Sequence, residues 1–223
     1  MTTVRLAGLL TTATLTLATG VASAKDAGGM TAAKRGEYLV HVGGCNHCHT
    51  PWIFNKDLGM PVPDMSRMLS GHPQGGADPE GKRGAHDIGL IGPSFTSFQM
   101  PFGTVYAPNL TPEKDTGLGA WTEQMFLGAF RKGKHMGADG RAILPPMPWL
   151  DMAAMTDDDL KALYAYLRSI PAIRNSVPEH KVPVPAIAAI TASFEKVKAM
   201  MAAQKAGAGK APGAPKDKAP PAP

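Results

Sequence analysis

Cysteine is scarce in this chain, whose 223 residues include only Cys45 and Cys48. A structural zinc site needs four ligands, usually from two Cys or His pairs at matching spacing. No second pair is available, since there is no further cysteine and the histidines outside this segment form no H-x-x-x-H pattern: His41, His72, His86, His135 and His180. The scarcity therefore argues against a zinc site.

Long apolar runs are also missing. The chain opens with M-T-T-V-R and then about a dozen mostly apolar residues interrupted by threonines, short of the roughly 20 that a membrane-spanning helix needs. With Arg5 before the run and small residues at Ala22 and Ala24 after it, the pattern is typical of a secretory signal. We therefore expect residues 1–24 to be a signal peptide and the mature protein to lie in the periplasm.

A strong excess of charge is absent from the body of the chain. Of the net charge of +5, Arg5 contributes one unit and residues 203–223 contribute three, which leaves +1 for residues 25–202. A nearly neutral body gives no support for nucleic-acid binding. The segment 203–223 has no aromatic, β-branched or leucine residue, so we expect a disordered Ala/Pro/Lys tail. Its lysines suit contact with an acidic partner or a membrane surface.

Helical periodicity is clear in three segments. They follow Thr31, Thr122 and Thr156, and the first is a candidate N-cap. A weaker apolar stripe predicts a fourth helix in a C-terminal extension over residues 179–202, with these members: Ile187, Ile190, Phe194, Val197 and Met201. No internal repeat is visible.

Sustained periodicity is lacking between Thr50 and Trp121, where Gly and Pro are frequent. So long a segment without regular structure is unusual inside a compact domain. The exception is a chain that wraps a large apolar cofactor, because the cofactor then supplies the missing core. The sequence therefore predicts such a cofactor.

The stretch C-N-H-C-H, which holds both cysteines, points to the identity of this cofactor. A thioredoxin-like redox pair would need a βαβ setting that the downstream sequence does not offer, whereas C-x-x-C-H is the signal for c-type haem attachment. Two thiols at this spacing can bond to the two vinyl groups on one porphyrin edge. His49 then lies beneath the ring, where a neutral imidazole reaches the iron, and His47 is a spacer. We therefore expect one haem c, attached covalently through Cys45 and Cys48.

The sequence resembles the bacterial c-type cytochromes, particularly the haem domains of cytochrome c subunits of membrane-bound dehydrogenases. The resemblance covers about residues 34–173 and rests on motifs in the family's order: R-G-E-Y-L-V-H-V-G-G-C-N-H-C-H-T, F-G-T-V-Y-A-P-N-L-T-P, G-A-W-T-E-Q-M-F, L-P-P-M-P-W and M-T-D-D-D-L-K-A-L-Y-A-Y-L-R-S-I-P. It implies an all-α, cytochrome c-like haem domain with long Gly/Pro-rich loops, which we place at residues 25–178, and His/Met ligation of the iron. The segment 64–92 is longer and more polar than the family's loop.

Methionine is the leading candidate for the second axial ligand, and the chain has 13. Met60, Met100 and Met147 precede prolines, which help to hold an extended loop over a haem face. Met147, in L-P-P-M-P-W, is the one that matches the ligand of the family, and we favour it. The bis-histidine alternatives are His72 and His86.

These features together predict an electron-transfer protein, not an enzyme, which is either free or a subunit of an oxidoreductase complex. With His49 and Met147 on the iron, no position is vacant for a substrate, so single electrons would pass from a dehydrogenase to an oxidase or cytochrome of the respiratory chain. The rival hypothesis is a catalytic or gas-sensing haem protein of peroxidase-like character. In it, the segment 64–92 supplies or gates a labile sixth ligand.

Overall fold

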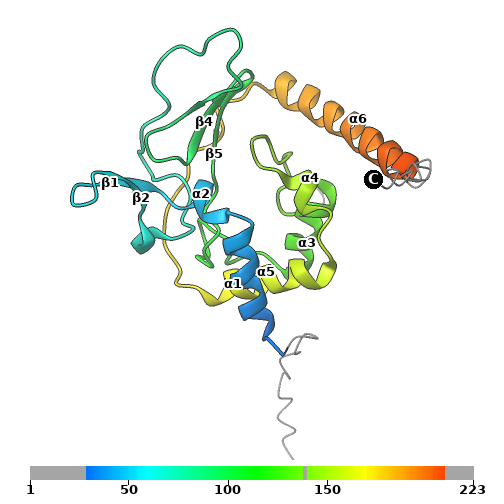
Figure 1. Cartoon of the computed structure of the whole chain (residues 1–223), viewed down its shortest axis with the longest axis horizontal. Coiled ribbons are helices and arrows are strands. Elements are labelled where there is room, and N and C mark those ends of the chain that lie inside the picture. Colours follow the sequence, from blue (N-terminus) through cyan, green and yellow to red (C-terminus); the bar gives the residue numbers. More distant parts are fainter. Residues whose placement is uncertain (1–28, 138–139, 209–223) are drawn as a thin grey trace, which may run out of the picture.

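The computed structural model describes residues 29–137 and 140–208. The predicted signal peptide, residues 1–24, and residues 209–223 of the predicted tail lie outside the described residues. Figure 1 shows the elements in their order along the chain. They are α1 (Ala32–Val42), α2 (Cys45–His49), β1 (Trp52–Asn55), β2 (Met60–Pro63), the 3-10 helix η1 (Met65–Arg67), β3 (Leu90–Ile91), β4 (Ser97–Met100), β5 (Gly103–Tyr106), α3 (Glu123–Lys132), α4 (Trp149–Met152), α5 (Asp157–Ser169) and α6 (Val184–Ala208).

The three helices expected after threonines are present as α1, α3 and α5. In each, the threonine hydroxyl accepts a hydrogen bond from a backbone N–H three residues later, which satisfies a donor that has no partner inside the helix. α1 packs against α5, and Gly36 permits the close approach because a side chain there would meet the backbone of Ala162. The main hydrophobic core forms around this crossing: Val40, Leu69, Leu118, Phe126, Leu160, Leu163, Tyr166 and Leu167.

The fold is not strictly all-α, which corrects the sequence-based expectation. Strands β1 and β2 form one antiparallel hairpin, and β3, β4 and β5 form a second antiparallel sheet in that order. No strand has more than four residues among those that the structure describes, too few for an alternating pattern to emerge from a Gly- and Pro-rich segment. The sequence pattern therefore could not reveal them.

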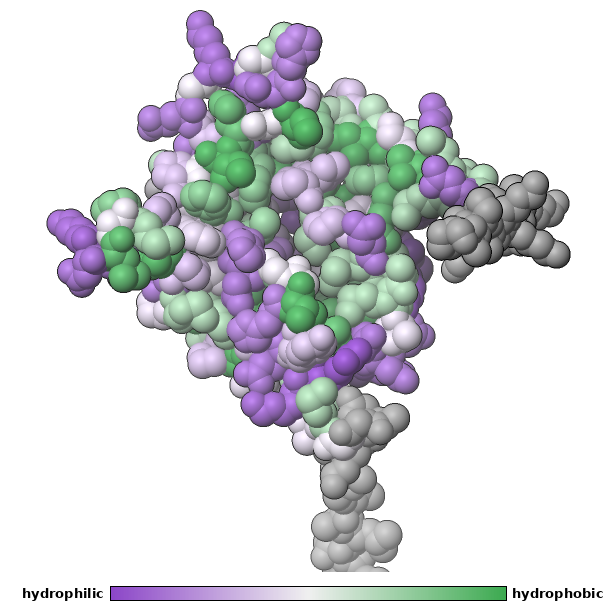
Figure 2. All heavy atoms as spheres, in the orientation of Figure 1, coloured by the Kyte–Doolittle hydropathy of each residue, from purple (hydrophilic) through white to green (hydrophobic). Residues whose placement is uncertain are grey.

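The β1–β2 hairpin projects from the body directly after α2 (Figure 1). Figure 2 shows apolar side chains gathered on this projection, with polar ones at its end. The exposed apolar residues are Ile53, Phe54, Leu58 and Met60. The element next to the cysteine-bearing helix thus carries apolar surface to the outside of the molecule.

Helix α6 extends from the β4–β5 sheet past α4 (Figure 1). Part of the predicted stripe packs against the body: Ile187, Ile190 and Phe194 are half-buried there, whereas Val197 and Met201 are exposed. The helix continues to Ala208, so residues 203–208 of the predicted tail are helical in the structure. Among the described helices, none is both long and apolar enough to cross a membrane.

Candidate cofactor pocket

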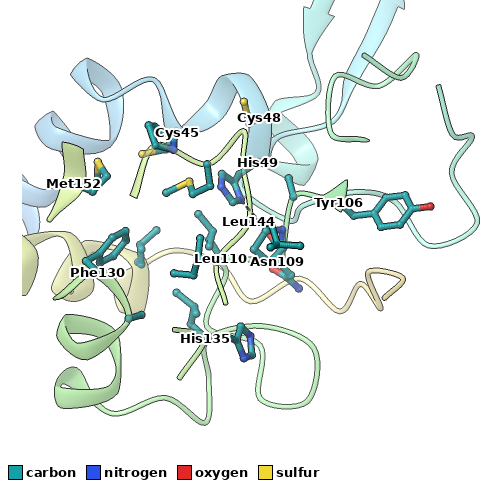
Figure 3. Close-up of a pocket in the computed structure, with 18 of the residues that line it drawn as sticks. Cys45, Cys48, His49, Tyr106, Asn109, Leu110, Phe130, His135, Leu144 and Met152 are labelled. Atoms are coloured by element: carbon teal, nitrogen blue, oxygen red, sulfur yellow. Dashed lines mark hydrogen bonds between the residues drawn. The ribbon is translucent and has the colours of Figure 1, made fainter. Parts of the chain in front are cut away.

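A cavity of about 290 Å³ lies between α1, α2, α3, α5 and the loops that join them. Figure 3 shows Cys45, Cys48 and His49 at one end and His135 at the other. The lining is mostly apolar and includes Val40, Val105, Leu118, Phe126, Phe130 and Leu163. An apolar cavity with a few polar groups is typical of a cofactor site.

Helix α2 brings both cysteines and His49 to the cavity wall. It begins after Gly44, whose φ of 65° is the left-handed conformation that turns the chain sharply between α1 and α2. Cys45 and Cys48 are one helical turn apart and therefore lie on the same face. Burial raises the pKa of each thiol, and both thiols are free.

His49 is held as a neutral imidazole. It is 6% exposed, and its Nδ1 lies 2.9 Å from the backbone oxygen of Pro108. Since a carbonyl can only accept, Nδ1 carries the proton and Nε2 keeps its lone pair. Burial lowers the pKa of His49, and the Pro108 hydrogen bond opposes this only in part. Nε2 forms no hydrogen bond with any described residue, so it is available as a metal ligand.

Of the three methionines that precede proline, Met147 lines the cavity. Met60 is exposed on β2, and Met100 packs against the cluster of Val105, Ala142 and Leu144. Met152 also lines the cavity, and it packs against the main core.

The two histidines proposed as alternative ligands lie elsewhere. His72 is fully buried outside the cavity lining, and its Nδ1 lies 2.9 Å from Oγ1 of Thr96. His86 is exposed in the segment 64–92. No residue between 50 and 97, all of which the structure describes, lines the cavity.

Three basic residues that the sequence analysis did not identify as site residues line the cavity: His135, Arg141 and His180. Burial, with the positive charge of Arg141, lowers the pKa of His135 and of His180 to about 4, so both are neutral at pH 7. The guanidinium of Arg141 makes no hydrogen bond or ion pair with the described residues, although the negative charge of Glu179 attracts it. Among the described residues, this part of the cavity thus presents a positive charge that has no direct hydrogen-bond or ion-pair partner.

Two other polar residues of the cavity lining, Tyr106 and Asn109, already have hydrogen-bond partners. The hydroxyl of Tyr106 points away from it (Figure 3) and donates to Oδ1 of Asp78 at 2.6 Å. Asn109 has a turn role, because its Oδ1 accepts from the backbone N–H of Thr111 at 2.9 Å and its Nδ2 donates to the backbone oxygen of Ile173 at 2.8 Å.

Comparison with known proteins identifies relatives that are similar over most of the chain. The chain is 30% identical over 168 residues to the cytochrome c subunit of alcohol dehydrogenase (quinone) from Gluconobacter oxydans, covering 74% of this chain and 27% of that protein. It is 29% identical over 153 residues to the gluconate 2-dehydrogenase cytochrome c subunit of Pantoea cypripedii, covering 68% and 26%. The chain is homologous to cytochrome c subunits of dehydrogenases. No protein-family model matches it.

This homology supports a haem domain, although the chain spans about a quarter of the length of either subunit. A third relative, a dihaem cytochrome c-type protein of Cereibacter sphaeroides, is 27% identical over 157 residues, which cover 69% of this chain and 41% of that protein. The described residues fit the implied haem. Two thiols one turn apart and an imidazole without a partner on Nε2 face an apolar cavity, which is the donor set for covalent attachment and axial ligation.

Proposed function

We propose that the chain is a periplasmic c-type cytochrome with one haem, which carries single electrons from a dehydrogenase towards the respiratory chain. The observation that supports this most directly is that Cys45, Cys48, His49 and Met147 line the same apolar cavity. When bound, haem c supplies the one-electron redox centre. Cys45 and Cys48 would hold it covalently, and His49 and Met147 would coordinate its iron.

The hydrogen bond between His49 and Pro108 supports the role of His49. A ligating histidine ordinarily donates its second ring N–H to a carboxylate or carbonyl, which fixes the ring orientation and the tautomer. His49 makes this contact with a backbone oxygen, so it leaves no ionisable partner beside the metal ligand. This contact would hold the imidazole with Nε2 available to the iron.

The cavity also contains polar side chains that can bind the propionate groups on the charged edge of the porphyrin. The guanidinium of Arg141 makes no hydrogen bond or ion pair with the described residues, and guanidinium groups bind carboxylates strongly. His180 is already anchored, because its Nδ1 accepts a hydrogen bond from the backbone N–H of Tyr106 at 3.3 Å. The other nitrogen, Nε2, then carries the proton and is a neutral donor. Arg141 and His180 thus form a subsite suited to the propionate groups.

The cysteine count supports a single haem. The chain has two cysteines, which provide one C-x-x-C-H motif, and the similarity to a dihaem protein extends over less than half of that protein. The predicted signal at residues 1–24 supports export. The dehydrogenase subunits among the relatives support a dehydrogenase as electron donor, and the lysine-rich end of the chain suits an acidic partner surface.

The axial ligation also explains why we propose a carrier and not an enzyme. The polar segment 64–92, which the rival hypothesis uses to supply or gate a sixth ligand, does not line the cavity. This favours outer-sphere electron transfer over the rival catalytic or gas-sensing function.

Carbon monoxide added to the reduced, haem-loaded protein tests the proposal. We expect weak, slow binding and no peroxidase turnover, because Met147 must leave before carbon monoxide can bind. The Met147→Ala variant is the control for an open position. Rapid, tight binding by the unaltered protein, together with peroxidase turnover, would overturn the carrier function.

A further inference from the structure

The loop that carries Met147 has little regular structure of its own. Between Ala142 and Pro148, its internal support includes one long backbone hydrogen bond, 3.3 Å from the N–H of Met147 to the oxygen of Leu144. The Trp149 N–H donates to the oxygen of Met147 at 2.9 Å, where α4 begins. The position of Met147 therefore depends on what packs against the loop.

Helix α6 packs against the loop on the N-terminal side of Met147. Ala142 and Leu144 are buried in a small cluster with Val105, and Ile187 and Ile190 of α6 cover this cluster. The segment before α6 is held in turn by β5, because Thr104 and Lys181 exchange two backbone hydrogen bonds of 3.1 and 2.9 Å. One end of α6 is thus fixed to the body beside the loop.

The same helix packs on the C-terminal side of Met147. Trp149 is 2% exposed, and the ring of Phe194 meets it edge-on with centroids 5.2 Å apart. Nζ of Lys198 lies 5.1 Å from the centre of the Trp149 ring, within the range of a cation–π contact. Gly133 also packs against the ring of Trp149, because a Cβ at this position would be 2.5 Å from the indole. Trp149 is therefore enclosed.

These contacts come from one face of α6. Ile187, Ile190, Phe194 and Lys198 recur at helical spacing, so α6 lies along the loop and touches it on both sides of Met147. Met200, on the same helix, is 64% exposed. The face of α6 that meets the loop is thus distinct from the face that meets solvent.

We propose that α6 is a brace that holds Met147 in the cavity and thereby sets how readily the sixth axial position opens. The inference rests on the proposed role of Met147 as a ligand, and it assigns Ile187, Ile190 and Phe194 as positioning residues. An external ligand binds in proportion to the fraction of molecules in which the position is open. Weakening the brace raises this fraction without changing either axial ligand.

The test uses the full-length, haem-loaded protein with Phe194→Ala, Ile190→Ala and the double variant. Alanine keeps the helical propensity of α6, so helix formation is not the variable. Met200→Ala is the matched control, because it removes a large apolar side chain from the exposed part of the same helix. The readouts are the carbon monoxide affinity of the reduced protein and the temperature at which the sulfur-to-iron charge-transfer band of the oxidised protein disappears.

We expect the double variant to bind carbon monoxide about tenfold more tightly than the unaltered protein and to lose the band at a lower temperature, since a loss of about 1.4 kcal/mol corresponds to a factor of ten. Met200→Ala should match the unaltered protein. Phe194→Leu, which retains most of the volume, should be intermediate and keeps the test valid if the double variant folds poorly.

Two failures can be told apart. If Met147→Ala leaves the band and the carbon monoxide affinity unchanged, the ligand assignment fails. If Met147→Ala removes the band while the Phe194 and Ile190 variants match Met200→Ala in both readouts, Met147 is the ligand but α6 is not its brace.

Discussion

The Nδ1 atom of His49 lies 2.9 Å from the backbone oxygen of Pro108, which is 59 residues further along the chain. The two residues are brought together by a short stretch between them. Gly71 donates its N–H to the oxygen of His49 at 2.7 Å, and His72 donates its N–H to the oxygen of Ala107 at 2.9 Å. The orientation of the histidine thus depends on backbone groups from three separate segments.

Gly71 is the tightest point of this arrangement. Its φ is +79°, and a Cβ would be 2.6 Å from the oxygen of Ala107. We expect Gly71→Ala to lower the free energy of unfolding by about 2–5 kcal/mol, the sum of backbone strain and overpacking. Gly75→Ala is the control, because Gly75 has a φ of +72° but no neighbour within 4 Å. It should cost about 1–2 kcal/mol, as measured by denaturant unfolding. Equal losses would show that the close contact does not matter.

Covalent attachment predicts how the haem behaves on denaturation. In acid acetone, the haem of the unaltered protein should remain with the polypeptide, because the thioether bonds survive unfolding. A variant with both Cys45→Ser and Cys48→Ser has no thiol left, so any haem that it binds should pass into the solvent. The absorbance of the two phases measures the partition. Release of haem from the unaltered protein, produced in a periplasm competent for maturation, would contradict the attachment.

Met147→Ala should remove the sulfur-to-iron charge-transfer band and lower the midpoint potential, because a thioether ligand raises the potential. Met100→Ala provides the comparison, since Met100 packs against the cluster of Val105, Ala142 and Leu144 but does not itself line the cavity. It should cost about 1–3 kcal/mol of stability through lost packing while keeping the band. The opposite result, in which only Met100→Ala removes the band, would identify Met100 as the ligand.

Stability should depend on pH through His135 and His180, whose pKa values of about 4 lie below the ordinary value of 6.5. At pH values between 4 and 6.5, the unfolded chain therefore binds more protons than the folded one. The free energy of unfolding should therefore fall as the pH decreases from 6.5 to 4, by up to about 1.4 kcal/mol per pH unit for each histidine. Unfolding of the haem-loaded protein at a series of pH values measures this slope, which the negative charge of the propionates beside His180 would reduce.

Glutamine substitutions identify the groups responsible. His135→Gln and His180→Gln should each reduce the slope, because the new side chain does not titrate. His86→Gln, at an exposed position, serves as the control. A slope that neither of the first two variants changes would show that other groups govern the acid sensitivity.

Local sequence determined the helices that frame the cavity and the donor set on its wall. Thr31, Thr122 and Thr156 cap helices α1, α3 and α5, because a cap needs only a hydroxyl and a backbone N–H three residues away. Cys45, Cys48 and His49 are likewise close in sequence, so their shared position follows from one turn of helix. Interactions this local can be read from residue spacing alone.

Tertiary structure decided the features that depend on distant segments. The strands were not predictable from the sequence. Each pairs over at most four residues, and the pairing forms only when the chain folds. Three methionines share the same Met-Pro pattern, and the family resemblance favoured Met147 among them. Packing places Met147, but neither Met60 nor Met100, in the cavity lining. Arg141 and His180 reach the cavity from separate loops, and Pro108 meets His49 from across the molecule. Such contacts carry no signature in local spacing, because the chain must fold before they exist.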